Sequence, residues 1–179
     1  MIKEKQKRFL ALYEPNHDRF ERFCRARVYG RMEYQDLINE SLLIAYEKLD
    51  TLHSEKHFLS FIIGISIRIL SNFNKNKKEV FLTDNEHIDA SEDQKSFEDI
   101  EIAMEVEHLY KMLERLNEKQ KECLILFELT GFSIKEIMEL QKASESTVKQ
   151  RLRRGRIQLK ELIEHESKIA LKTKEAKDE

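Results

Sequence analysis

Apolar side chains recur at spacings of three and four residues along most of the chain, a pattern that predicts helices rather than strands. The expected helices cover residues 9–13, 15–29, 33–49, 58–74, 102–116, 118–130 and 134–140, and a longer last helix starts at Ser144 or Ser146. The whole chain has only 4 Gly and 1 Pro, far fewer turn residues than a sheet-rich fold needs. We therefore predict an all-α fold.

Helical periodicity is lost in one polar, acidic stretch, which is typical of a linker. We predict a first helical domain over 1–80, an acidic flexible linker over 81–100, a second helical domain over 101–165 and a charged, frayed tail over 166–179. The chain of 179 residues is long enough for two such small domains.

The formal net charge of −2 hides a strong segregation of charge. No acidic residue lies between Lys56 and Glu79, whereas the segment from Glu79 to Glu107 contains eleven acidic residues. The segment from Lys142 to Lys160 contains seven basic residues and one acidic residue. Two basic patches separated by an acidic connector suggest two contacts with a polyanion. The alternative for either patch is a solvated helix face.

Several other classes of protein are not indicated. Cys24 and Cys123 fit neither a disulfide framework nor a zinc motif, and His53 and His57 have no third ligand in the sequence pattern. The longest apolar run, residues 58–67, is half of a membrane span, and the N-terminus resembles no signal peptide. We expect a cytoplasmic protein without membrane insertion, cofactor, metal or enzymatic activity.

The stretch from Gly131 to Leu162 has the pattern of a helix-turn-helix. Gly131 can end one helix, and Ser133 with Glu136 forms a capping box that begins the next. After a tight turn at 141–143, a longer basic helix follows, whose Val148, Leu152, Ile157, Leu159 and Leu162 we expect to point inward. Such a helix can enter the major groove of DNA. The alternative is a plain helical hairpin with a basic solvent face.

These residues resemble a known family. The segments 116–122, 131–137 and 146–156 resemble region four of bacterial sigma factors, which reads the minus-thirty-five promoter element. Residues 36–46 resemble region two, where an acidic helix docks on the polymerase, and residues 58–78 look like the helix that recognises and melts the minus-ten element. The two-part layout is that of the small extracytoplasmic-function group. Lys142 stands in the turn where the family often has Gly, so we expect a turn that is strained or differently shaped there.

The resemblance implies three sets of functional residues. Docking on core RNA polymerase is assigned to Asp36, Leu37, Asn39, Glu40 and Leu43. Contacts on the minus-ten side are assigned to Phe61, Arg68, Asn72, Phe73, Lys75, Lys77 and Lys78. The recognition helix would bind DNA through Ser146, Thr147, Lys149, Gln150, Arg151, Arg153, Arg154 and Arg156.

The function implied is that of a sigma factor, which binds core RNA polymerase and directs promoter recognition and transcription initiation. Its partners would be core polymerase, double-stranded promoter DNA, the melted strand and an anti-sigma factor. Two alternatives remain open at this point. One is a helix-turn-helix regulator that works without polymerase, which leaves the Asp36/Glu40 helix unexplained. The other is a helical decoy for a sigma-factor antagonist.

Overall fold

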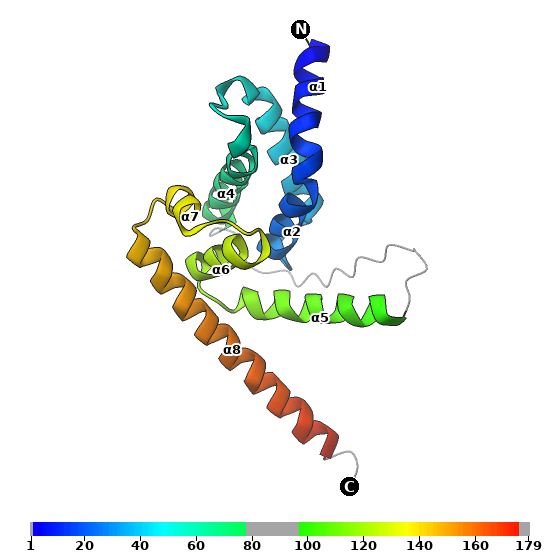
Figure 1. Ribbon diagram of the computed structural model, residues 1–179. Coiled ribbons are helices and arrows are strands. Elements are labelled where there is room, and N and C mark those ends of the chain that lie inside the picture. Colours follow the sequence, from blue (N-terminus) through cyan, green and yellow to red (C-terminus); the bar gives the residue numbers. More distant parts are fainter. Residues whose placement is uncertain (1, 78–96, 176–179) are drawn as a thin grey trace.

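The protein is described by a computed structural model, which covers the backbone of residues 2–77 and 97–175 and the side chains of 3–73 and 102–169. All regular structure in these ranges is helical, which confirms the predicted all-α class (Figure 1). The helices are α1 (Ile2–Tyr13), α2 (His17–Val28), α3 (Tyr34–Glu47), α4 (Phe58–Lys77), α5 (Phe97–Glu114), α6 (Glu118–Leu124), α7 (Ile134–Gln141) and α8 (Glu145–Glu175).

Helices α1 to α4 form the N-terminal half, around a centre of aromatic and aliphatic side chains. Phe20 and Phe23 of α2 and Phe58 of α4 are completely buried, and burial of each such side chain contributes about 1.5–3 kcal/mol. Where α3 packs on α4, the hydroxyls of Ser41 and Ser66 lie 2.9 Å apart and satisfy each other. A turn at Gly30, with φ of 69°, leads from α2 towards α3.

Helices α5 to α8 form the C-terminal half, and their ends follow from local capping. The side chain of Asn117 accepts a hydrogen bond from the backbone N–H of Lys119 and begins α6. The chain continues into a π-helical turn over 125–129, and the buried Thr130 hydroxyl donates to the carbonyl of Leu126 at 2.6 Å. Gly131, with φ of 70°, then turns the chain towards α7.

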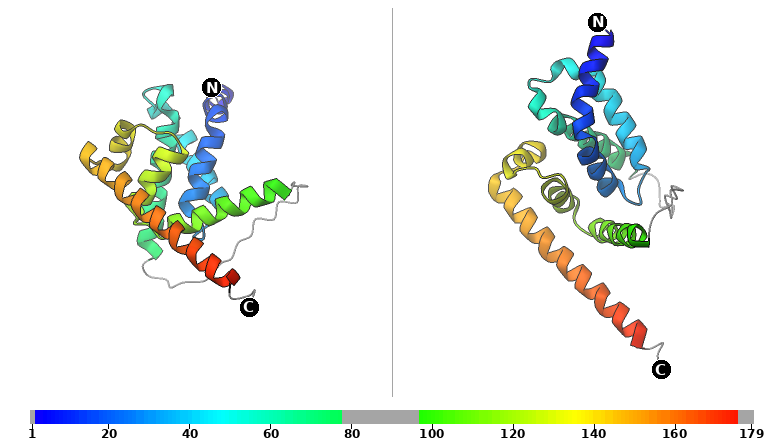
Figure 2. Two further views of the ribbon diagram at one scale, coloured as in Figure 1. Left: turned by 60° about the horizontal axis from the view of Figure 1, so that its bottom comes forward. Right: turned by 45° about the vertical axis from the view of Figure 1, so that its right-hand side comes forward.

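The two halves pack against each other rather than lying apart. Helix α2 contacts the π-helical turn, and α4 contacts α7, so that α6 and α7 lie between the N-terminal half and α8 (Figures 1 and 2). The buried apolar side chains of both halves form one continuous cluster. Each half therefore buries part of the apolar surface of the other.

Several sequence-based boundaries were wrong. Helix α1 begins at Ile2 instead of residue 9. Most of the predicted linker lies outside the described residues, but residues 97–100 form the first turn of α5. The predicted frayed tail is helical as far as Glu175, because residues 166–175 contain no Gly or Pro and consist mainly of good helix formers. The helix predicted over 118–130 ends at Leu124 and changes to the π-helical turn.

Candidate nucleic-acid interface

The helix-turn-helix is built from α7, a three-residue turn and the first turns of α8. In the capping box, Ser133 accepts from the backbone N–H of Glu136, while the Glu136 carboxylate accepts from the backbone N–H of Ser133 at 2.8 Å. Lys142 ends α7 in the left-handed conformation, with φ of 49° and ψ of 52°. This conformation is strained for a residue with a Cβ atom, as the sequence predicts. Ser144 caps α8 by accepting from the backbone N–H of Thr147 at 3.3 Å.

One face of α8 carries exposed polar and basic side chains at helical spacing. Gln150, Arg153 and Arg154 are exposed and, at spacings of three and four residues, share one side of the helix. No acidic partner pairs with Arg153 or Arg154 in the described part of the chain. Val148 and Leu152 are buried on the opposite side, as predicted, but Ile157 is 48% exposed. The expectation for Ile157 was wrong because the buried stripe passes through Gly155 to Leu159 instead.

The other predicted DNA-contacting residues of α8 have partners within the protein. Lys149 forms an ion pair with Glu145 at 2.6 Å, and Arg156 forms one with Glu128 at 2.7 Å. The half-buried Arg151 donates from Nη1 to the side-chain oxygen of Gln141 at 2.7 Å. The hydroxyls of Ser146 and Thr147 lie 3.0 and 2.9 Å from the Ser144 hydroxyl. The predicted residues are therefore on one element, but their charges are not equally available.

Helix α4 presents the predicted minus-ten residues with different degrees of exposure. Arg68 and Asn72 are exposed, whereas Phe61 and Phe73 are half-buried. The Phe61 ring lies 6.5 Å from that of Phe58 and packs against the apolar cluster. The side chains of Lys75 and Lys77 and the whole of Lys78 lie outside the described residues.

The predicted polymerase-docking residues of α3 do not all share one face. Asp36, Asn39 and Glu40 are exposed, and Leu43 is 61% exposed. Their spacing of three and four residues places them together on one side of the helix. Leu37 is completely buried in the N-terminal half and cannot contact a partner. It was assigned wrongly because it is adjacent to Asp36 in the motif, while the helix turns its side chain inward.

The contact between the halves is strongly polar as well as apolar. Arg27 of α2 is 5% exposed and donates to Glu118 at 2.7 Å and to Glu122 at 3.2 Å. Arg31 donates to Glu114 at 2.8 Å and pairs with Glu118 at 2.6 Å. Burial raises the pKa of the Glu118 carboxyl, but Arg27, Lys121 and Arg31 outweigh it and lower the pKa to about 2.

Neighbouring groups complete this contact. Burial lowers the pKa of Lys121 to about 8, although its ion pair with Glu114 opposes the shift. Arg19 of α2 donates through Nε to the carbonyl of Thr130 at 3.0 Å. Arg19 and Arg27 of α2, and Arg31 just after the Gly30 turn, thus face a carbonyl and carboxylates of the other half. The charge pattern of the sequence is consistent with such a contact, but the individual partners are 83 to 111 residues apart along the chain.

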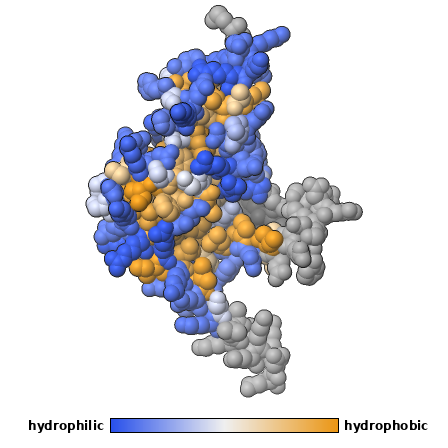
Figure 3. All heavy atoms as spheres, viewed as in Figure 1, coloured by the Kyte–Doolittle hydropathy of each residue, from blue (hydrophilic) through white to orange (hydrophobic). Residues whose placement is uncertain are grey.

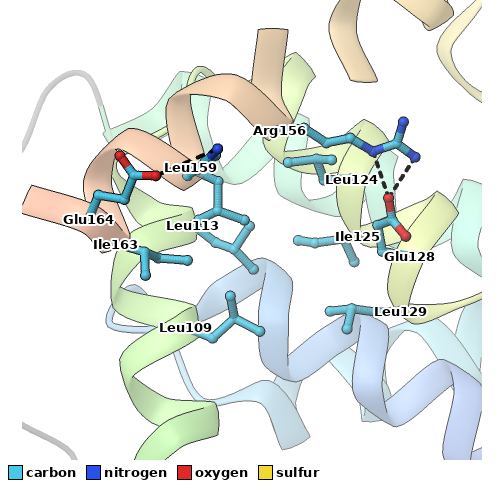
Figure 4. Close-up of a pocket in the computed structure, with 11 residues that line it drawn as sticks. Leu109, Leu113, Leu124, Ile125, Glu128, Leu129, Arg156, Leu159, Ile163 and Glu164 are labelled. Atoms are coloured by element: carbon cyan, nitrogen blue, oxygen red, sulfur yellow. Dashed lines mark hydrogen bonds and ion pairs between the residues drawn. The ribbon is translucent and has the colours of Figure 1, made fainter. Parts of the chain in front are cut away.

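A further feature that the sequence did not reveal is an apolar groove of about 410 Å³ in the C-terminal half (Figure 4). It lies between α5, the π-helical turn and α8. Its lining includes Leu109, Leu113, Leu124, Ile125, Leu129, Leu159 and Ile163, with Arg156 and Glu128 at one edge. The groove-lining stripe of α5 continues to Ile102 and Val106, which are exposed, and the space-filling view shows hydrophobic surface over α5 (Figure 3). The sequence signal for this groove is the apolar stripe of α5, part of which stays exposed in the folded protein.

None of the described helices is long and apolar enough to cross a membrane. No group of three or more His, Cys, Asp or Glu side chains among the described residues has an arrangement suited to a metal ion.

Comparisons with known proteins bear on both halves. The family model described as "Sigma-70, region 4" matches residues 107–159. The ECF RNA polymerase sigma factor BldN of Streptomyces coelicolor is 27% identical over 144 residues, which are 79% of this chain and 54% of BldN. The RNA polymerase sigma factor SigZ of Bacillus subtilis is 29% identical over 152 residues, 82% of this chain and 84% of SigZ. The chain thus spans about half the length of BldN.

Solved structures share the fold. The sigma factor RpoE in complex with the anti-sigma factor NepR from Bartonella quintana matches with a TM-score of 0.69 and 20% identity, over 90% of this chain and 98% of that one. CnrH in complex with the cytosolic domain of CnrY matches with a TM-score of 0.65 and 16% identity, over 89% of this chain and 90% of that one.

Fold and surface together define a class: an all-helical protein of two packed halves, with a helix-turn-helix in the second. Within that class, residues 107–159 match the model of sigma-70 region 4, and the chain is similar to the sigma factors BldN and SigZ over 79% and 82% of its length.

Proposed function

We propose that this protein is a sigma factor that binds core RNA polymerase and directs it to promoters. The observation that carries the proposal is the helix-turn-helix within the matched region, whose α8 exposes Gln150, Arg153 and Arg154 on one face. Arginine pairs with guanine and glutamine with adenine in the major groove. In this proposal these three residues contact base edges, and Ser146 and Thr147 at the start of α8 hold a phosphate.

The N-terminal half is proposed to dock on the polymerase and to contact the minus-ten element. Support for docking comes from α3, where Asp36, Asn39, Glu40 and Leu43 form an exposed acidic face with one apolar side chain. Support for the minus-ten role comes from the exposed Arg68 and Asn72 on α4. Phe73 would stack on an unpaired base. In this proposal, the domain 1–80 binds polymerase and the minus-ten element, and the domain 101–165 binds the minus-thirty-five element. The protein acts in the cytoplasm as a non-enzymatic factor.

In this proposal, the two halves are packed together only in the free protein. Helices α4 and α7 are in contact: a Cβ atom built on Gly64 would lie 3.6 Å from Leu140 Cδ2. The minus-ten and minus-thirty-five elements are separated by about 25 base pairs, or roughly 85 Å of duplex at 3.4 Å per pair. Two halves that touch each other cannot reach both promoter elements at the same time. We infer that the halves separate when the protein binds polymerase and promoter.

Run-off transcription with purified core polymerase on a promoter library tests the proposal. The pair of substitutions Asp36→Lys and Glu40→Lys should abolish polymerase binding, and Arg153→Ala with Arg154→Ala should abolish specific transcripts while polymerase binding is kept. Glu14→Lys with Asp18→Lys is the matched control, because both carboxylates are exposed and four residues apart in another region.

The outcomes distinguish the alternatives. Transcripts that depend on the chain and are lost in both variants, but not in the control, establish a sigma factor. DNA binding without polymerase binding would instead support a polymerase-independent regulator. Binding to neither would contradict both and leave the decoy. An anti-sigma factor is a further partner in this proposal, since RpoE from Bartonella quintana is solved with one.

A further inference from the structure

Gln141, the last residue of α7, lies at the centre of a buried chain of hydrogen bonds. Its amide nitrogen donates to Glu122 Oε1 at 2.9 Å and to the carbonyl of Lys119 at 3.2 Å. Its amide oxygen accepts from Nη1 of Arg151, on the recognition helix, at 2.7 Å. Gln141 is 9% exposed and Glu122 is 1% exposed. All the hydrogen-bonding groups of the Gln141 side chain except one oxygen lone pair are therefore occupied by protein.

The orientation of this amide is fixed by its neighbours. If the amide were flipped, its NH₂ group would face the Arg151 guanidinium and its oxygen would face the Glu122 carboxylate, and both contacts would be repulsive. Glu122 therefore sets the direction of the Gln141 amide, and the amide oxygen in turn sets the position of Arg151. Glu122, Gln141 and Arg151 all belong to the C-terminal half, and the other carboxylate oxygen of Glu122 accepts from Arg27 of the N-terminal half at 3.2 Å.

Gln141 differs from the other residues that hold basic side chains of α8, because its own side chain is neutral. Lys149 and Arg156 are held by the carboxylates of Glu145 and Glu128, which offset their charge. Arg151 is held by an amide, so its positive charge is not offset at the point of contact. A guanidinium has five N–H donors, and those not bonded to Gln141 remain able to bind a DNA phosphate or a base edge.

We propose that Gln141 is a positioning residue for DNA recognition: held by Glu122, it orients Arg151 for contact with DNA without neutralising its charge. The inference deepens the proposed function and rests on it for the DNA contact. The orientation of Arg151 itself can be measured with no DNA present.

The first test is NMR spectroscopy of the full chain with ¹⁵N-labelled arginine. In the wild type, the Arg151 guanidinium should show restricted rotation, with separate signals from its two Nη groups. Gln141→Met keeps the side-chain length and removes both hydrogen-bonding groups, and it should collapse these signals into one. The signals of Arg156, anchored by Glu128, serve as an internal control and should not change. Restricted Arg151 signals that persist in Gln141→Met would overturn the positioning role.

The second test is a double-mutant cycle in the holoenzyme, with the duplex that wild-type holoenzyme selects from a random-sequence pool. Gln141→Met should weaken DNA binding about three- to tenfold, because the arginine is misplaced rather than removed; complete loss of a base-contacting arginine costs roughly 5- to 150-fold. Arg151→Ala should weaken it at least as much, and adding Gln141→Met to Arg151→Ala should have no further effect. Arg153 does not contact Gln141, so the effects of Arg153→Ala and Gln141→Met on DNA binding should be additive.

Two more variants protect the test against a general loss of structure. Arg151→Lys keeps the positive charge but loses the planar fork of the guanidinium, and its DNA binding should depend less on Gln141. Glu128→Gln frees Arg156 from its carboxylate and should strengthen DNA binding, the opposite of Gln141→Met. Additive effects of Gln141→Met and Arg151→Ala would overturn the inference. If wild-type holoenzyme selects no DNA, the proposed function and the DNA contact of Arg151 are both refuted. If it selects DNA but the Arg151 signals are unchanged in Gln141→Met, the positioning role alone is refuted.

Discussion

At the scale of single residues, the turn of the helix-turn-helix carries a measurable cost. Lys142 has φ of 49°, and the left-handed conformation costs a residue with a Cβ atom about 1–2 kcal/mol. Lys142→Gly removes this strain but increases the freedom of the unfolded chain. We expect a net gain in the free energy of unfolding of about 0.5–1 kcal/mol, measured by urea denaturation.

The control is the same substitution in a right-handed helix. Lys160→Gly, at an exposed position within α8, should lose about 1 kcal/mol. If both substitutions destabilised the protein equally, the left-handed turn would not be the source of strain.

Glu118 predicts a dependence of stability on pH. Its pKa in the folded protein, about 2, is below the ordinary value of 4.5, so the folded state favours the ionised carboxylate more than the unfolded state does. The contribution is fully present above pH 4.5 and is lost as pH falls towards 2. Urea denaturation at pH 6 and pH 3.5 should show a smaller loss of stability in Glu118→Gln than in the wild type. Parallel losses in the two proteins would contradict this assignment.

At the scale of helices, two glycines with different surroundings give opposite expectations. A Cβ atom on Gly155 of α8 would lie 2.9 Å from Leu124 Cδ1 and 3.2 Å from Leu124 Cγ, in a buried contact between α8 and α6. Overpacking of this kind typically costs about 1–3 kcal/mol. Gly155→Ala should therefore destabilise the protein although alanine favours helices. Gly64→Ala should be tolerated or stabilising by up to about 1 kcal/mol, because its Cβ would make an ordinary contact at 3.6 Å.

Thermal unfolding of both variants measures the difference. A Gly155→Ala protein as stable as Gly64→Ala would mean that α8 moves away from Leu124 without cost.

The elements that sequence could predict are those set by local chemistry. The capping box at Ser133, the stop at Gly131 and the strained turn at Lys142 each depend on residues within a few positions, and all are present. The wrong predictions have non-local causes. Leu37 lies in an acidic motif, but it is buried by helices that approach from elsewhere. Gln141 carries no sequence signal, since its role appears only when Glu122 and Arg151 are brought next to it.

At the scale of the whole molecule, the ion pairs of Arg27 and Arg31 should control whether the halves stay packed. Arg27→Ala removes the buried cation that pairs with Glu122, which is 1% exposed, and leaves the ion pair with Lys119 at 3.4 Å. Removal of one partner of a buried ion pair typically costs about 3–5 kcal/mol. Separation of the halves lets Glu122 reach water. We expect Arg27→Ala with Arg31→Ala to increase the radius of gyration of the free protein in small-angle scattering.

Arg25→Ala is the matched control, because Arg25 pairs with Glu21 and Tyr34 within its own half. Its scattering should resemble that of the wild type. Scattering from Arg27→Ala with Arg31→Ala that also matched the wild type would mean that apolar contacts alone keep the halves together.

The single apolar cluster shared by the two halves has a consequence for dissecting the protein. A cut between residues 78 and 96 would give two pieces, each with an uncovered apolar surface where the other had been. Expressed alone, each piece should aggregate or be degraded. Produced together, the two pieces should recover each other as a stable heterodimer, so this one chain offers a ready-made split reporter whose reassembly can be followed in living cells.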